Sequence, residues 1–241
     1  MTRAKLAKKA TKPGKGKGRA RAKRVPETQE ERSERSRAQI LRAALALFST
    51  HGYHGTSMRD IAKAADVSTG NVYHQFTDKE TIFRVLLEQF WEALERSDSP
   101  LNEALRQGAF PDHLEKLAGA ARETVATHRP YVALIYVDVV EFDGSHIRRF
   151  YQDMAGRFEV FLASDEGRAG LGRLRSDVPP VTAIMTAVRF FFHYYSVELI
   201  FGVPRHFGVD EDTALRQTVE LLKFGMLNPG TVPDRESAPE R

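Results

Sequence analysis

Apolar residues recur every three or four positions along most of the chain, a period that predicts helices rather than strands. In the first hundred residues this pattern divides into four segments, and we expect helices at 36–50, 57–65, 68–76 and 77–96. Residues typical of helix caps separate these segments. The two middle helices are too short to bury much core by themselves. In such a pair, one short helix commonly supports the other, which contacts an external partner.

The remaining apolar segments predict a second group of helices, separated by Pro and Gly residues. Segment 179–201 is apolar on nearly every side and must therefore be buried on nearly every side. In a small domain this requires two packing partners, which we expect to be the chain's own core and a second copy of the chain. We expect 210–227 to be its companion helix, and the Gly- and Arg-rich stretch 168–177 to be a mobile loop. The predicted fold class is all-α, with these later helices at 101–107, 112–128, 130–142, 145–165, 179–201 and 210–227.

Capping residues mark the start of each short helix. Ser57 and Asp60 have the spacing of a capping box, with Thr56 as an alternative cap. Ser68 offers the next cap after a break at Asp66-Val67. The run Thr77-Asp78-Lys79-Glu80 is a further capping box, which would begin the fourth helix at Thr77. The three starts lie so close together that they predict a helix-turn-helix.

The expected outer face of helix 68–76 is polar and poor in charge. Val72 and Phe76 lie four residues apart and should point inward. The outward positions lack the Glu/Lys pairs of an ordinary solvated helix; they are Thr69, Asn71, Tyr73, His74 and Gln75. Asn can pair with an adenine edge, and aromatic or imidazole groups can contact bases or phosphate. The alternative is a scaffold helix with a polar surface.

The expected DNA contacts extend beyond that face. An exposed helix N-terminus with Ser and Thr hydroxyls suits phosphate oxygens, because free N–H groups and the dipole favour an anion. Gly70 lowers helix stability by about 1 kcal/mol, which suggests a close approach of backbone or DNA there. Lys79 stands in the first turn of its helix, where it could meet a phosphate. The expected DNA-binding residues are Thr56, Ser57, Ser68, Thr69, Gly70, Asn71, Tyr73, His74 and Lys79.

These residues resemble the TetR/AcrR family of transcriptional regulators over about residues 35–85. The resemblance implies a DNA-binding helix-turn-helix, a helical ligand-binding domain and a homodimer whose last two long helices form the interface. A symmetric dimer would place two recognition helices on a palindromic operator. One departure is Asp66, where the family usually has Gly; Asp tolerates left-handed backbone, so we expect the turn to persist. The resemblance is carried by Phe48, Gly52, Tyr53, Thr56, Ser57, Ile61, Ala62, Ala65, Val67, Ser68, Gly70, Val72, Tyr73, Phe76, Lys79 and Glu80.

The charge is distributed unevenly along the chain. The net charge is +4, yet residues 1–25 contain 11 basic residues and no acidic one, which leaves 25 basic against 32 acidic residues elsewhere. A segment rich in Lys, Ala and Gly cannot fold alone, so we expect disorder there. It is either an arm that follows the DNA backbone or enters the minor groove, or a solubilising extension.

Aromatic residues follow the later helices at helical spacing, and three ionisable residues interrupt them: Asp138, Arg189 and His193. A buried charge needs a partner, so Asp138 and Arg189 could form a structural ion pair. They could equally be the convergent polar groups of a pocket for a bulky, apolar or aromatic effector. An aromatic stripe is also compatible with plain core. The expected ligand-binding residues are Tyr131, Ile135, Asp138, Phe142, Phe158, Phe161, Arg189 and His193.

Other functions find little support in the sequence. There is no cysteine, no nucleophile elbow, no cofactor-binding glycine loop and no metal spacing among the eight histidines. We therefore expect no enzyme, no cofactor and no metal. The charged N-terminus and the interrupted apolar segments predict neither a signal peptide nor a membrane span, and favour a cytoplasmic protein. The remaining alternative is an architectural protein that coats DNA without sequence preference.

We accordingly expect four regions. Residues 1–32 form a disordered basic arm, and 33–80 form the helix-turn-helix DNA-binding domain. Residues 81–229 form a helical ligand-binding and dimerisation domain, and 230–241 form a flexible tail. The helix 77–96 joins the two domains and would carry the effector's influence to the DNA-binding domain. We expect the whole protein to be a repressor that binds double-stranded DNA as a dimer.

Overall fold

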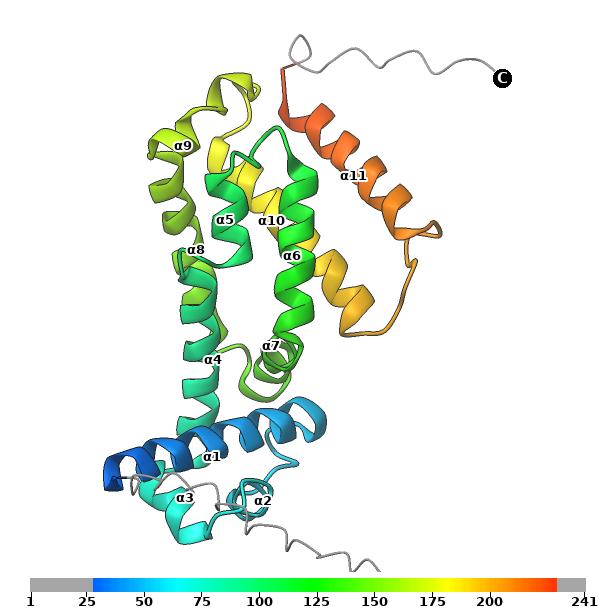
Figure 1. Ribbon diagram of the computed structural model, residues 1–241. Coiled ribbons are helices and arrows are strands. Elements are labelled where there is room, and N and C mark those ends of the chain that lie inside the picture. The colour runs from blue at the N-terminus through cyan, green and yellow to red at the C-terminus, as the bar shows by residue number, and fades with distance from the viewer. Residues whose placement is uncertain (1–27, 229–241) are drawn as a thin grey trace, which may run out of the picture.

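The computed structural model describes residues 28–228, which form an all-helical chain (Figure 1). The expected arm at 1–27 and tail at 229–241 lie outside the described residues. Apart from one bridge between Leu174 and Leu227, residues 28–228 contain no strand, so the predicted fold class is confirmed. The helices are α1 Gln29–His51, α2 Met58–Ala64, α3 Thr69–Gln75, α4 Lys79–Glu95, α5 Pro100–Arg106, α6 Leu114–Thr127, α7 Arg129–Phe142, α8 Ile147–Leu162, α9 Asp165–Arg168, α10 Pro180–Leu199 and α11 Glu211–Met226, with a short 3-10 helix at Leu171–Arg173.

Helix α1 begins at Gln29, seven residues before the predicted start, so residues 29–32 belong to a helix and not to the expected disordered arm. The reason is a capping box that the sequence analysis missed. The Thr28 hydroxyl accepts from the Glu31 amide, and the Glu31 carboxylate accepts from the Thr28 amide. The rest of α1 follows the predicted pattern, because Ile40, Leu41, Ala44 and Phe48 are buried.

Helices α2 and α3 form the predicted pair with a tight turn. Ser57 caps α2 in a reciprocal box with Asp60, and Ser68 caps α3 by accepting from the Asn71 amide. Asp66 adopts φ 54°, the left-handed backbone expected of it. The Val67 amide then donates to the Ala62 carbonyl, so hydrogen bonds of the main chain hold the turn.

Helix α4 leads from the helix-turn-helix into the rest of the molecule (Figure 1). It begins at Lys79, and its cap is Asp78, whose carboxylate accepts from the Thr81 amide at 2.7 Å. The predicted start at Thr77 was therefore two residues too early. Its apolar face divides between two cores. Phe83 belongs to the helix-turn-helix core, and Phe90 to a small cluster under α7.

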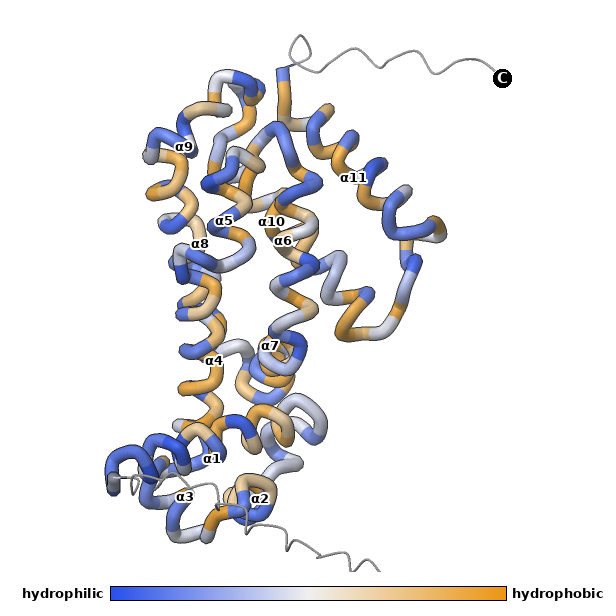
Figure 2. The backbone as a smooth tube through the Cα atoms, in the orientation of Figure 1, coloured by the Kyte–Doolittle hydropathy of each residue, from blue (hydrophilic) through white to orange (hydrophobic). Residues whose placement is uncertain are grey.

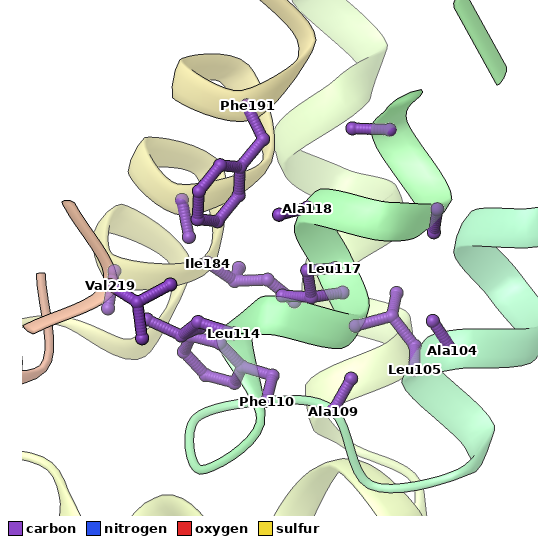
Figure 3. Packing of buried hydrophobic residues seen from close by; sticks show 14 of the residues in the cluster. Ala104, Leu105, Ala109, Phe110, Leu114, Leu117, Ala118, Ile184, Phe191 and Val219 are labelled. Atoms are coloured by element: carbon purple, nitrogen blue, oxygen red, sulfur yellow. The ribbon is translucent and has the colours of Figure 1, made fainter. Parts of the chain in front are cut away.

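The largest core lies where α5, α6 and α10 meet α11. Figure 3 shows Leu114, Leu117 and Ala118 of α6 facing Ile184 and Phe191 of α10. Val219 of α11 reaches the same cluster, so the predicted companion helix shares the core of α10. Close packing of these side chains forms a scaffold beside which the other helices leave a cavity.

Within one chain, helix α10 packs one side on the large core and carries an exposed polar stripe of Thr182, Thr186, Arg189 and His193, so burial of its other side by a second copy stays a prediction. The expectation for stretch 168–177 is wrong. Stretch 168–177 is an ordered turn and not a mobile loop. The Arg175 amide donates to the Met226 carbonyl and the Asn228 amide donates to the Arg173 carbonyl, which ties the turn to the end of α11.

Helix α11 has an apolar surface that no described part of the chain covers. Hydrophobic and hydrophilic stretches alternate along it (Figure 2), as expected for an amphipathic helix. One apolar face meets the core through Val219. On another face Leu221 and Phe224 remain 73% and 75% exposed.

Candidate DNA interface and effector pocket

Helix α3 is mounted on the core by two side chains. Val72 and Phe76 are buried among α1, α2 and α4, as predicted. Tyr73 stands out on the opposite side, 56% exposed, beside an exposed His74. A large aromatic residue so exposed on a helix anchored from behind is suited to contact with a partner.

Asn71 and Gln75 do not belong to the exposed face, contrary to expectation. The Asn71 amide group donates to the Ser36 hydroxyl at 2.8 Å, and the Gln75 amide group donates to the Ser33 hydroxyl at 2.8 Å. Both bonds join α3 to α1. Each side chain uses one amide N–H to fasten α3 to α1, and so helps to position α3.

Thr56 is buried, and its hydroxyl donates to the Gly52 carbonyl at 2.9 Å. It therefore shapes the loop before α2 and is not available to DNA, contrary to expectation. The Ser57 hydroxyl lies 2.5 Å from the Asp60 carboxylate, whose pKa this hydrogen bond lowers. Ser57 is exposed but serves first as a cap.

Lys79 was expected to meet a phosphate, but it also acts within the protein. Its ammonium donates to the carbonyls of Tyr53 at 2.6 Å and Thr56 at 2.7 Å, and it lies 4.0 Å from the centre of the Tyr53 ring. Burial lowers the pKa of this lysine. Two of its three donors are thus committed to the loop between α1 and α2.

The same loop is held from the other side by Glu141 of α7, a residue that the sequence analysis missed. Its carboxylate accepts from the amides of Tyr53 and His54 at 3.0 and 2.6 Å, and contacts the His54 imidazole at 2.5 Å. Burial opposes ionisation of Glu141, but these hydrogen bonds outweigh it and lower the pKa. Gly52 makes the contact feasible, since a Cβ there would lie 2.5 Å from the carboxylate.

Glu141 was detectable in principle, because a charge near the end of an apolar helix needs a partner. The same reasoning identified Asp138 as a charge that needs a partner, but paired it wrongly with Arg189. Asp138 is fully buried, with one carboxylate oxygen 2.7 Å from the His146 imidazole and the other accepting from the Ile147 amide at 2.9 Å. It holds the start of α8 and forms no pair with Arg189. The proposed ion pair and the proposed ligand contact of Asp138 are both wrong.

A cavity of about 870 Å³ lies between α4, α5, α6, α7, α8 and α10. Most of its wall is aromatic or aliphatic; Trp91 stacks on Phe150 with ring centres 4.0 Å apart. Four of the eight expected ligand-binding residues line it: Ile135, Phe158, Arg189 and His193. The sequence analysis missed the contribution of α4, because its apolar face reads as ordinary core.

The other expected ligand-binding residues do not line this cavity. Tyr131 stacks beside Phe90, with ring centres 5.7 Å apart, but does not itself line the cavity. Phe142 packs on Tyr53 at 4.5 Å and on Phe83 at 5.0 Å, so it belongs to the helix-turn-helix core. Phe161 packs against the large core. For these residues the alternative of plain core holds.

The comparisons with known proteins agree with this architecture. Residues 40–86 match the family model described as "Bacterial regulatory proteins, tetR family". The chain is 25% identical over 195 residues to the transcriptional repressor KstR2 of Rhodococcus jostii, which covers 80% of this chain and 92% of that protein. It is 39% identical over 67 residues to the regulator UidR of Escherichia coli, which covers 27% of this chain and 34% of that protein.

A solved structure shares most of the fold. The repressor NalD of Pseudomonas aeruginosa, described as the secondary repressor of the MexAB-OprM multidrug efflux pump, superposes with a TM-score of 0.54. The alignment has 25% identity and covers 82% of this chain and 99% of that one. These findings define the class of protein as a helix-turn-helix transcriptional regulator and not an enzyme. The chain is similar to regulators of the TetR family, whose model matches its residues 40–86.

Residues 28–228 offer neither a candidate membrane span nor a candidate metal site. No helix within residues 28–228 is long and apolar enough to span a bilayer. In the same range, His, Asp and Glu side chains nowhere gather in a group that could hold a metal ion.

Proposed function

We propose that the chain is a repressor that binds a palindromic operator as a homodimer and releases it when a small apolar or aromatic effector binds, in the cytoplasm where its DNA lies. The observation that carries the DNA-binding role is the exposed face of α3, anchored from behind by Val72 and Phe76. The runner-up, a protein that coats DNA without sequence preference, would have no need of such a face.

The residues that read bases are, in this proposal, the half-buried Thr69 and the exposed Gly70, Tyr73 and His74 of α3. Ser68 at the N-terminus of α3 would meet a phosphate. Exposed basic residues of α2, Arg59 and Lys63, would contact the backbone, since the first helix of such a pair crosses the phosphates. Asn71 contributes to DNA binding indirectly, because its bond to Ser36 holds α3 against α1.

The dimer is supported by the exposed apolar face of α11. Leu221 and Phe224 stand one turn apart, and burial of large apolar side chains against the same residues of a second copy would form a two-fold interface. Such symmetry would place two α3 helices in successive major grooves.

The effector would act through two helices that reach both the cavity and the DNA reader. Helix α4 lines the cavity with Trp91 and holds the α1–α2 loop with Lys79. Helix α7 lines the cavity with Ile135 and holds the same loop with Glu141. An effector that favours a different position of either helix would shift the population away from the DNA-binding arrangement.

The test is selection of bound fragments from random DNA. We expect a few palindromic sites, and we expect Tyr73→Ala to lower affinity for the selected site by about tenfold or more, the effect of losing one good base contact. Gln152→Ala, at an exposed position of α8, is the matched control. Diffuse selection without a palindrome, or an unchanged affinity of Tyr73→Ala, would contradict the proposal.

The effector role is tested separately. Apolar aromatic compounds that raise the unfolding temperature are added to the selected operator complex, and operator affinity is measured at saturation. If affinity stays at the value without compound for every bound compound, the coupling does not exist.

A further inference from the structure

The polar groups of the cavity are unevenly matched. Glu95 and Arg157 form an ion pair with each other. The Asn102 amide group donates to the carbonyls of Leu94, Glu95 and Arg96, and the Thr124 hydroxyl donates to the Ala120 carbonyl. These side chains are therefore occupied by the protein itself and have little left to offer a ligand.

Arg189 is different, because no carboxylate within residues 28–228 pairs with it. Its guanidinium lies 5.4 Å from the centre of the Tyr151 ring, which also lines the cavity. Burial raises the pKa of Tyr151, so its hydroxyl stays protonated and can donate a hydrogen bond. His193 lies one turn further along α10 and lines the same space.

One region of the cavity thus gathers hydrogen-bond donors without a free carboxylate to balance them, and the remaining wall is apolar. We infer that the cavity takes an anionic amphiphile, with an aromatic or alicyclic body among Trp91, Phe150 and Phe158 and a single carboxylate, sulfonate or phosphate held by Arg189. This inference rests on the proposed effector role and adds the chemical class of the effector.

The physical argument is one of charge and geometry. A guanidinium presents several donors in one plane, and its bonds to an anion are stronger than those between neutral groups. A cationic ligand would meet Arg189 as a like charge, and a neutral apolar ligand would gain nothing from it. The partial exposure of Arg189 allows a ligand's charged end to remain near solvent while its body is buried.

The experiment uses two dyes with the same rings, anilinonaphthalene sulfonate and neutral phenylnaphthylamine, which differ by the sulfonate. The chain has one tryptophan, Trp91 in the cavity wall, so energy transfer from it reports dye bound nearby. Dissociation constants are measured for the full chain, for Arg189→Gln and for Arg216→Gln, a control at an exposed arginine of α11.

We expect the sulfonate dye to bind about tenfold more tightly than the neutral dye, the size of a partly exposed charge-assisted contact. Arg189→Gln should remove this preference by weakening the sulfonate dye alone, and Arg216→Gln should preserve it. A preference that survives Arg189→Gln, or no preference at all, overturns the inference while leaving a working cavity.

A filled cavity serves as the second control. Val188→Phe adds bulk at a partly buried cavity residue without adding a second tryptophan, and should weaken both dyes equally. If neither dye transfers energy from Trp91, or if Val188→Phe leaves both affinities unchanged, the proposed effector pocket itself fails. That outcome is distinct from the loss of charge preference alone.

Discussion

The helix-turn-helix and the part of the cavity around Arg189 use their polar side chains in opposite ways. Around α2 and α3, Ser57, Asn71, Gln75 and Lys79 are all bonded within the protein, and the exposed remainder is small. At the cavity, Arg189 has no ion-pair partner in the described part of the chain. The first arrangement gives a surface of fixed shape, whereas the second gives a site that a ligand must complete.

This difference shows which part of the molecule is held rigid by its own hydrogen bonds. A reader of base sequence must keep its side chains within hydrogen-bond distance of defined atoms, so its supporting bonds are satisfied in advance. An effector site instead needs free binding capacity. The loop at residues 52–56 connects the two regions, because Glu141 of α7 and Lys79 of α4 bond to it and both helices also line the cavity.

The largest expected effect is that of Phe83→Ala on the free energy of unfolding. Phe83 is fully buried and contacts the rings of Phe48, Tyr53 and Phe142, so its loss should cost about 3–5 kcal/mol in the free energy of unfolding. The control is Phe191→Ala in the large core. If the two regions unfold together, urea titration followed by circular dichroism will show one transition for both variants. A second transition, shifted only by Phe83→Ala, would show that they are independent.

Next in size is Glu141→Gln, which should destabilise the chain by about 2 kcal/mol through weaker hydrogen bonds to Tyr53 and His54. The pKa of Glu141 is lower in the folded chain than its ordinary value of 4.5. Its contribution is therefore present above pH 4.5 and lost as pH falls through the lower folded value. Unfolding curves between pH 7 and pH 3 should show a smaller loss for the variant. An equal slope for both proteins would exclude this role.

Asn71→Ala should have a smaller effect, about 1 kcal/mol, because one hydrogen bond to Ser36 is lost. Tyr73→Ala, on the exposed face of the same helix, should leave the free energy of unfolding nearly unchanged while weakening operator binding. The two variants distinguish a residue that stabilises the position of α3 from one that contacts DNA. If Tyr73→Ala lowers the free energy of unfolding as much as Asn71→Ala does, this distinction is wrong.

The smallest expected change is a gain. Gly70→Ala should stabilise α3 by about 0.5–1 kcal/mol, since a Cβ there would meet only the Ser68 hydroxyl, at 3.9 Å. If DNA approaches closely at this position, operator affinity should fall although the protein is more stable. Thermal unfolding and operator titration of one preparation measure both. Equal or higher affinity would show that Gly70 is free of DNA.

Much of the DNA reader could be predicted from the sequence because its signals are local. Caps at Ser57 and Ser68, the inward pair Val72 and Phe76, and the left-handed Asp66 depend on neighbours a few residues away. The bonds from the polar side chains of α3 to α1 could not be predicted. The bond from Asn71 to Ser36 spans 35 positions and exists only after α1 and α3 have packed.

The lining of the cavity was predicted less well for the same reason. Helical periodicity identifies an apolar face but not the helix that it meets, so Tyr131, Phe142 and Phe161 could not be separated from Ile135 and Phe158. The partner of Asp138 was missed because His146 lies beyond a turn whose geometry the sequence does not reveal. The cavity itself is a property of how six helices pack.

The turn at Asp66 has a further consequence. Main-chain hydrogen bonds set the angle between α2 and α3, and Asn71 and Gln75 fasten α3 to α1. The outward positions 69, 70, 73 and 74 take no part in this fastening. They can accumulate substitutions with little risk to folding, so new operator preferences are accessible to natural drift or to a designed library while the scaffold stays the same.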